Sequence, residues 1–111
     1  MSRLLHLAIA AQLPAANGAD SYAPAGFTME GFIHCCWPNQ LAGVVERYYQ
    51  GREDLVLLDL DQRAFGSTLI EEDPGSGEKF PHLYRDIPMS AIISRRPLLL
   101  DGDGKVDVSF L

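Results

Sequence analysis

The hydrophobic residues of this chain fall into short runs that polar and glycine-rich stretches separate. Residues 4–8 form an apolar run that predicts a buried strand, although the start of a helix would give the same pattern. Residues 55–60 are nearly all apolar and are bounded by charge, which predicts a central strand covered on both faces. Further strands are predicted over residues 27–36, 68–72, 80–84, 92–100 and 106–110.

The clearest helical pattern follows Pro38, a residue suited to the first position of a helix. Apolar residues then recur at helical spacing and form one buried stripe: Leu41, Val44, Val45 and Tyr48. Gly51 is expected to end this helix. The alanine-rich segment 10–16 predicts an earlier short helix, residues 87–91 predict one helical turn, and residues 18–26 predict a loop. Because the strands gather after the two helices, the predicted fold class is α+β rather than a doubly wound α/β fold.

Length and charge narrow the class of protein. A chain of 111 residues allows one domain, which we place over residues 1–111. The 15 acidic residues outnumber the 9 basic ones and give a net charge of −6, which disfavours nucleic acid as a partner. No apolar run reaches the roughly 18 residues that span a membrane, and the first residues lack the pattern of a signal peptide. Cys35 and Cys36 are adjacent, a poor arrangement for a structural disulfide, so a cytoplasmic location is expected.

Three histidines are the main candidates for chemistry, because His6, His34 and His82 each lie between apolar neighbours in a predicted strand. A polar side chain in such a position needs a hydrogen-bond partner or faces a cleft. In one interpretation, two or three of these histidines line a single cleft. In the other, each is a neutral core residue bonded to a backbone carbonyl. The sequence leaves both interpretations open.

Other chemical sites are weaker candidates. His34 and Cys36 are predicted to share one face of a strand while Cys35 faces the other, and no second pair of cysteines completes a zinc site. Cys36 would become a nucleophile only if another histidine approached it. Residues 75–79 depart from a phosphate-binding loop and residues 101–105 from a calcium loop, so both are interpreted as turns. No metal site is predicted.

Two segments carry a resemblance to a known family: residues 31–36, which read GFIHCC, and residues 80–84, which read FPHLY. Together with LLHLA at 4–8, LVLL at 55–58 and Glu72, they resemble the bacterial family catalogued as domain of unknown function 952. The resemblance covers about residues 4–93 and leaves residues 94–111 as a C-terminal extension.

The resemblance implies an ADP-ribosyltransferase-like fold, in which a split pair of small β-sheets has two main helices alongside. In that fold a residue of the first strand typically holds the ribose of NAD, and His6 fits this role by position. Glu72 and Tyr84 are suggested counterparts of the glutamate that polarises the ribose and of the groups that grip the nicotinamide. A fold does not by itself establish a reaction.

The sequence therefore suggests a ligand-binding site made of His6, His34, His82, Tyr84 and Cys36, with Glu72 as the candidate catalytic residue. NAD or a related nucleotide-like molecule is the candidate ligand, and ADP-ribosyl transfer or NAD glycohydrolysis is the first reaction to consider. One alternative is a hydrolase or transferase that uses the same cleft for another substrate. The other is a non-catalytic interaction module in which the histidines are structural.

Overall fold

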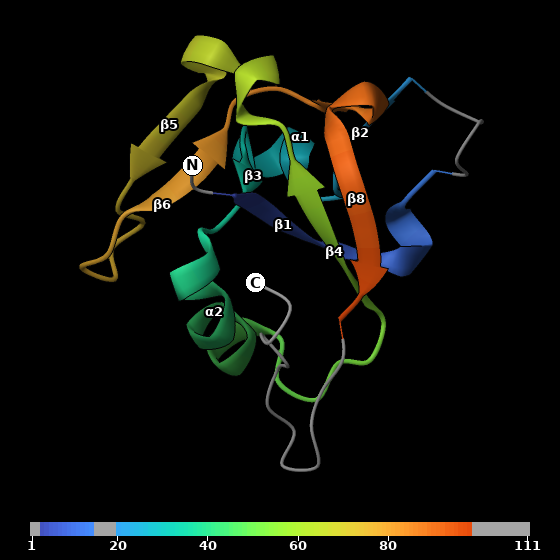
Figure 1. Ribbon diagram of the computed structural model, residues 1–111. Helices are drawn as coiled ribbons and strands as arrows, with labels where there is room; N and C mark the ends of the chain where they lie inside the picture. Colours follow the sequence, from blue (N-terminus) through green and yellow to red (C-terminus); the bar gives the residue numbers. More distant parts are fainter. Residues whose placement is uncertain (1–2, 15–19, 99–111) are drawn as a thin grey trace.

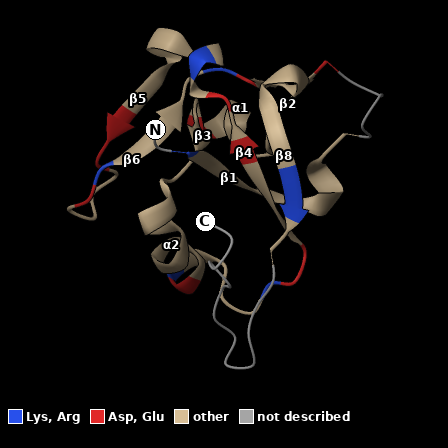
Figure 2. Ribbon diagram, viewed as in Figure 1, with Lys and Arg blue, Asp and Glu red and all other residues tan. Residues whose placement is uncertain are grey.

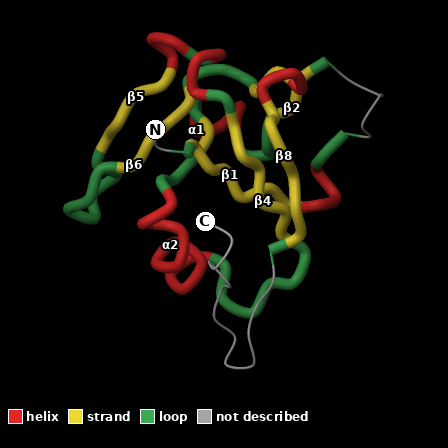
Figure 3. Tube along the Cα trace, in the orientation of Figure 1, coloured by secondary structure: helices red, strands yellow, loops and turns green. Residues whose placement is uncertain are grey.

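The computed structural model describes residues 3–14 and 20–98, which form three small antiparallel sheets with two α-helices beside them (Figures 1 and 3). The strands are β1 Leu4–Ile9, β2 Ser21–Tyr22, β3 Ile33–His34, β4 Leu55–Leu60, β5 Leu69–Glu72, β6 Phe80–Leu83, β7 Ile87–Pro88 and β8 Ile92–Pro97. The helices are α1 Phe27–Glu30 and α2 Leu41–Tyr48, with single 3₁₀ turns at Ala10–Gln12, Pro38–Gln40, Gln62–Ala64, Gly66–Thr68 and Met89–Ala91. This is the predicted α+β class. Within the described ranges, none of the helices is long and apolar enough to cross a membrane.

The hydrophobic core of the described residues lies on the two faces of the sheet with strand order β1-β4-β8, whose central strand is β4. Alternate residues of β1 and β4 enter two separate hydrophobic clusters, as the pleat of a strand requires. Leu58 faces the cluster that contains residues of β3 and β6, whereas Leu57 faces the cluster that contains Leu41 and Val45 of α2. The prediction that residues 55–60 form a central strand covered on both faces is confirmed.

A second sheet has the order β3-β6-β5, and a third pairs β2 with β7. One antiparallel bridge links the first sheet to the second at Leu5 and Cys36, whose backbone N–H groups donate to each other's carbonyl oxygens at 2.9 and 2.8 Å. Strand β1 therefore lies beside the chain that leaves β3. This arrangement brings the three histidine-bearing strands β1, β3 and β6 into one region of the molecule.

The prediction of one strand over residues 27–36 was wrong for its first half. Phe27–Glu30 form the short helix α1, and only Ile33 and His34 belong to β3. Gly31 explains the break, because its φ of 84° lies in the left-handed region that ends helices, and its N–H donates to the carbonyl of Phe27 at 2.8 Å. Gly31 therefore separates the helix from the strand.

Smaller differences concern the ends of elements. The predicted helix 10–16 is a single 3₁₀ turn, Ala10–Gln12, and residues 15–16 lie outside the described residues. Helix α2 ends at Tyr48, before the Gly51 that was expected to end it. The predicted loop 18–26 contains the strand β2, which is too short to show a periodic pattern. The predicted strand 106–110 also lies outside the described residues.

Candidate functional site

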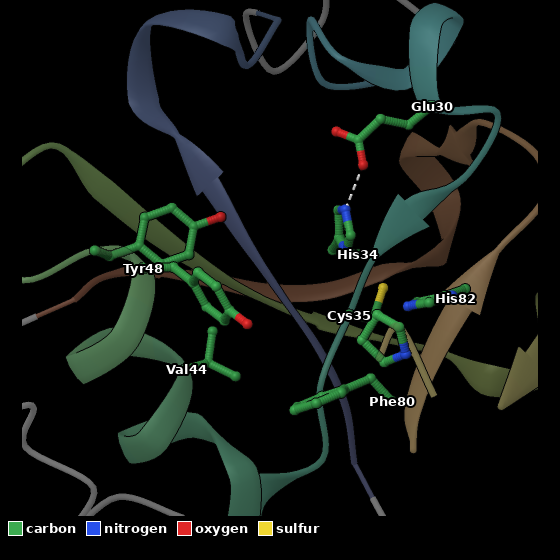
Figure 4. A pocket seen from close by; sticks show the side chains of 9 residues that line it. Glu30, His34, Cys35, Val44, Tyr48, Phe80 and His82 are labelled. Carbon is green, nitrogen blue, oxygen red and sulfur yellow. Dashed lines mark hydrogen bonds and ion pairs between the residues drawn. The ribbon is translucent and has the colours of Figure 1, made fainter. Parts of the chain in front are cut away.

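The site is built where β3 and β6 pair, because this pairing brings two of the predicted histidines together. His34 and His82 are register partners, and their rings meet edge to face with their centroids 5.4 Å apart. Both side chains line a cavity of about 370 Å³ (Figure 4). This volume lies at the small end of the roughly 300–1,000 Å³ that is usual for small-molecule sites.

His82 is the buried polar residue of this cavity, with only 2% of its surface exposed. The ring of Phe32 stacks on its imidazole with the centroids 4.3 Å apart, and its Nδ1 lies 3.0 Å from Oε1 of Glu72. Its Nε2 is buried and has no hydrogen-bond partner among residues 3–14 and 20–98. Because an ionised carboxylate only accepts hydrogen bonds, Nδ1 donates to Glu72, and Nε2 is the ring nitrogen that stays without a partner.

Glu72 lies behind His82 and is not among the residues that line the cavity. Its Oε1 also accepts a hydrogen bond from the hydroxyl of Tyr84. This bond and, after it, the bond from His82 lower the pKa of Glu72, and the same contact raises the pKa of Tyr84. The structure thus brings Glu72, His82 and Tyr84 together as the sequence suggested. The three side chains are linked by hydrogen bonds, in which Glu72 accepts from both Tyr84 and His82. Glu72 itself does not line the cavity.

Glu30 is the site residue whose role the sequence did not reveal. It is the last residue of α1, and its Oε2 lies 2.5 Å from Nε2 of His34 (Figure 4). Both side chains are about half exposed, so water screens this pair. The i, i+4 spacing was visible in the sequence, but it indicates a helical pair only if both residues are helical. Here the helix ends at Gly31, so the contact depends on the turn that follows it.

The prediction for the two cysteines was wrong in its assignment of faces. Cys35 lines the cavity beside His34, whereas Cys36 lies in the hydrophobic cluster that includes Leu5 and Leu41. Strand β3 ends at His34, so the strict alternation of a strand does not continue to Cys36, whose position is set by its bridge to Leu5. Burial raises the pKa of both thiols, that of Cys36 to about 12, so neither is poised as a thiolate nucleophile.

Aromatic and apolar side chains complete the cavity. Helix α2 and the chain that follows it contribute three of them, and the β5–β6 region contributes the others: Val44, Tyr48, Tyr49, Pro74 and Phe80. Tyr48 was predicted to lie in the buried stripe of the helix, but it is 63% exposed at the edge of the cavity. Among the described lining residues there is no lysine or arginine. The end of β5 is acidic, and the basic segment of β8 belongs to the other three-stranded sheet (Figure 2).

His6 has a different environment from the other two histidines. Its Nδ1 donates to the carbonyl oxygen of His34 at 2.7 Å, and its Nε2 accepts from the hydroxyl of Tyr22 at 3.0 Å. Burial lowers the pKa of His6 to about 4, so the imidazole is neutral near pH 7. With both nitrogens bonded, His6 joins β1 to β3. It lines a second cavity of about 230 Å³ beside the first, which His34 also lines and His82 does not.

The described residues contain no group of three or more His, Cys, Asp or Glu side chains arranged to hold a metal ion. The structure places three kinds of chemical group at this site. These are an imidazole lone pair, the Glu30–His34 pair and aromatic walls.

Comparison with known proteins places the chain in a family. The family model described as "Protein of unknown function (DUF952)" matches residues 7–95. The chain belongs to the DUF952 family. The crystal structure of protein CC0527 from Caulobacter crescentus is similar, with a TM-score of 0.84 and 28% identity over 97% of this chain and 96% of that chain. The solution NMR structure of CC0527 gives a TM-score of 0.82 at 28% identity, over 97% of this chain and 94% of that one. None of the curated proteins matches the chain.

In this DUF952 chain, the two segments that carried the resemblance pair with each other. Residues 31–36 contain β3, residues 80–84 contain β6, and their register places His34 opposite His82. These two segments contribute four of the residues that line the first cavity: His34, Cys35, Phe80 and His82.

Proposed function

We propose that the cavity beside His82 binds a small nucleoside-like ligand, with the nicotinamide–ribose part of NAD as the first candidate. The unpartnered Nε2 of His82 carries this proposal. A buried polar nitrogen without a hydrogen bond destabilises the empty protein by roughly 1–3 kcal/mol. A ligand that donates an O–H or N–H to Nε2 removes this deficit when it binds, and ribose hydroxyl groups are such donors.

The charge of the cavity supports a neutral or cationic ligand. Glu30 lines it, and the described lining residues include no lysine or arginine that would neutralise a phosphate. Tyr48 and Phe80 provide aromatic walls for a flat ring, and the positive pyridinium ring of NAD is attracted to aromatic faces and to carboxylates. We therefore place the pyrophosphate of NAD outside the cavity.

The roles of the individual residues follow from their positions. His34 and His82 are the proposed ligand contacts, because both line the cavity. Glu72 is a proposed positioning residue that fixes the tautomer of His82, instead of a residue that touches the ribose. The expected ADP-ribosyltransferase-like fold supports NAD as a candidate through the resemblance of the motif segments alone.

Hydrolysis of the bond between nicotinamide and ribose is a second candidate function, favoured by the Glu72–His82 hydrogen bond. A histidine oriented by a carboxylate through one nitrogen is an arrangement suited to general base catalysis at the other. In this reaction water loses a proton to Nε2, and its oxygen forms a bond to C1′ of the ribose. The bond from C1′ to the pyridinium nitrogen breaks, and neutral nicotinamide leaves with that electron pair.

An NMR titration tests the proposal. Isotope-labelled protein is titrated with nicotinamide riboside, NAD, ADP-ribose and nicotinamide, and each sample is then assayed for released nicotinamide. We expect localised shifts at His34, His82 and Val44 with nicotinamide riboside and NAD, and weaker effects with ADP-ribose. Silence of these residues at millimolar concentrations of all four compounds would overturn the proposal and favour the interaction module.

Two neighbouring glutamates supply a matched pair of variants. Glu72→Gln replaces the carboxylate that holds Nδ1 of His82, whereas Glu71→Gln changes a carboxylate that accepts from the indole of Trp37 at 2.7 Å. We expect Glu72→Gln to change the ¹⁵N shifts of the His82 ring and to weaken binding, and Glu71→Gln to do neither. Equal effects of the two substitutions would mean that Glu72 has no positioning role.

A further inference from the structure

A second cavity, of about 230 Å³, lies beside the one described above. The two cavities have three lining residues in common: Glu30, His34 and Tyr49. The second cavity extends from these residues toward β1 and α1, where its walls are largely apolar and include Leu7, Ile9, Pro24, Phe27 and Phe32. It has no assigned part in the proposed function, although it is large enough to hold a ring.

Two of the three shared lining residues, Glu30 and His34, form a weak pair. Glu30 and His34 meet at 2.5 Å, with side chains that are 47% and 56% exposed. Figure 4 places this pair at the end of the first cavity that is opposite Val44 and Phe80. A pair this exposed contributes roughly 0–1 kcal/mol, because water competes for both partners. A ligand that displaces it therefore loses little.

The polar groups of the three shared lining residues determine which charge a ligand segment can carry at the boundary between the cavities. Glu30 supplies a carboxylate, His34 an imidazole and Tyr49 a phenol. Neither cavity has a lysine or arginine among its described lining residues. A phosphate at the boundary would meet the Glu30 carboxylate without a compensating cation, whereas a hydroxyl, an amide or an ammonium group would find acceptors.

We infer that the two cavities are the two ends of one binding site for a two-part ligand, whose connecting segment is uncharged or cationic and passes beside Glu30, His34 and Tyr49. One end is a ring with a hydrogen-bond donor for Nε2 of His82, and the other is an apolar or aromatic group among Ile9, Phe27 and their neighbours. This inference rests on the proposed function, because it adds a second subsite to the same ligand. The proposed ligand is a nucleoside with an apolar substituent, and the two parts are not joined by a phosphate at the boundary between the cavities.

A series of synthetic probes tests the inference. The one-part probe is nicotinamide riboside, and the two-part probes carry a benzyl group at its 5′ position through an amine, an ether or a phosphate diester. Methyl NMR reports on each cavity separately, because Val44 lines only the first of the two, and Leu7 and Ile9 line only the second. We expect the amine and ether probes to shift all three residues and to bind about tenfold more tightly than nicotinamide riboside, because the benzyl ring becomes buried.

A blocking variant supplies the control. Ala25 is exposed and lines only the second of these cavities, so Ala25→Trp fills that cavity and leaves the first unchanged. Ala42 is exposed on α2 and lines neither cavity, so Ala42→Trp is the matched control. We expect Ala25→Trp to reduce the affinity of the benzylamine probe to that of nicotinamide riboside, and Ala42→Trp to have no effect.

The outcomes separate this inference from the proposed function. Two-part probes that shift Val44 but never Leu7 or Ile9 would overturn the inference and leave the proposed function in place. A phosphate-linked probe that binds as tightly as the amine-linked one would overturn the charge argument and with it the ligand class. If no probe shifts Val44 or His82, the proposed function fails first and the two-part site fails with it.

Discussion

Replacement of His82 by phenylalanine separates a ligand-binding histidine from a structural one. In the parent protein, the ring centroids of Phe32 and His82 lie 4.3 Å apart. Phenylalanine at position 82 keeps a ring that can stack on Phe32 and removes the nitrogen that has no partner. The slightly larger ring has room because this side chain lines the cavity of about 370 Å³. His6→Phe is the matched comparison, because it makes the same change at a histidine with both nitrogens bonded.

The expected magnitudes differ between the two sites. Loss of the unpartnered Nε2 of His82 is favourable by roughly 1–3 kcal/mol. The substitution also removes the bond to Glu72, but that side chain is 40% exposed and its carboxylate regains water. We expect the free energy of unfolding of His82→Phe to stay within about 1 kcal/mol of the parent. His6→Phe leaves the Tyr22 hydroxyl and the His34 carbonyl without their partner, which costs roughly 2–4 kcal/mol.

Urea unfolding at pH 7, followed by circular dichroism, measures both values, and the nicotinamide riboside titration measures binding. The expected result is a His82→Phe protein that is nearly as stable as the parent and no longer binds the probe. A loss of more than about 2 kcal/mol in His82→Phe would refute the reasoning, because it would mean that the imidazole holds the fold together. A His6→Phe protein as stable as the parent would refute the other half of the contrast.

Three further predictions concern single groups. Because the folded-state pKa of His6 is about 4, below the roughly 6.5 of an unfolded histidine, stability is complete above about pH 6.5. It then falls by up to about 3 kcal/mol as the pH decreases to 4, and urea unfolding of His6→Gln should show a flatter pH dependence. Gly31→Ala forces an alanine to a φ of 84° and should lose about 1 kcal/mol in thermal unfolding, whereas Gly43→Ala in α2 should gain about 0.5–1 kcal/mol. Tyr84→Phe removes the main cause of the lowered pKa of Glu72, so this pKa should rise in a carboxyl ¹³C titration; an unchanged value would contradict the contact.

The elements that could be predicted are those whose own residues determine them. Residues 55–60 are apolar on both sides of the strand, and a strand with that composition is stable only between two packed layers. The helix after Pro38 was equally clear, because its apolar residues lie on one face. By contrast, α1 has four residues, and its position depends on glycine at one end and on the packing of Phe27 against the core. A pattern search cannot identify an element that short.

The candidate site could be predicted only in part, because its geometry depends on pairing between distant strands. His34 and His82 were recognised from their apolar neighbours, and the register of β3 with β6 brings them together across 48 positions of the chain. Tyr49 gave no signal, and the spacing of Glu30 from His34 was not enough to assign Glu30 to the site. Glu30 belongs to a helix that was predicted as strand, and Tyr49 follows the last residue of α2, outside the periodic stripe. Both residues line the cavity because the ends of α1 and α2 lie beside it, and their own sequence neighbours do not indicate this.

His6 and His82 show why the decisive property of a buried histidine is absent from its local sequence. Each lies in a strand between apolar residues, and each is almost fully buried. Strand β1 places His6 against a backbone carbonyl of β3 and the hydroxyl of Tyr22, so its two nitrogens are satisfied within the fold. Strand β6 places His82 against Glu72, and its Nε2 has no hydrogen-bond partner among the described residues, so this is the nitrogen that we propose for a ligand. Whether the second nitrogen of a buried histidine has a partner therefore follows from the pairing of strands instead of from the residues beside it.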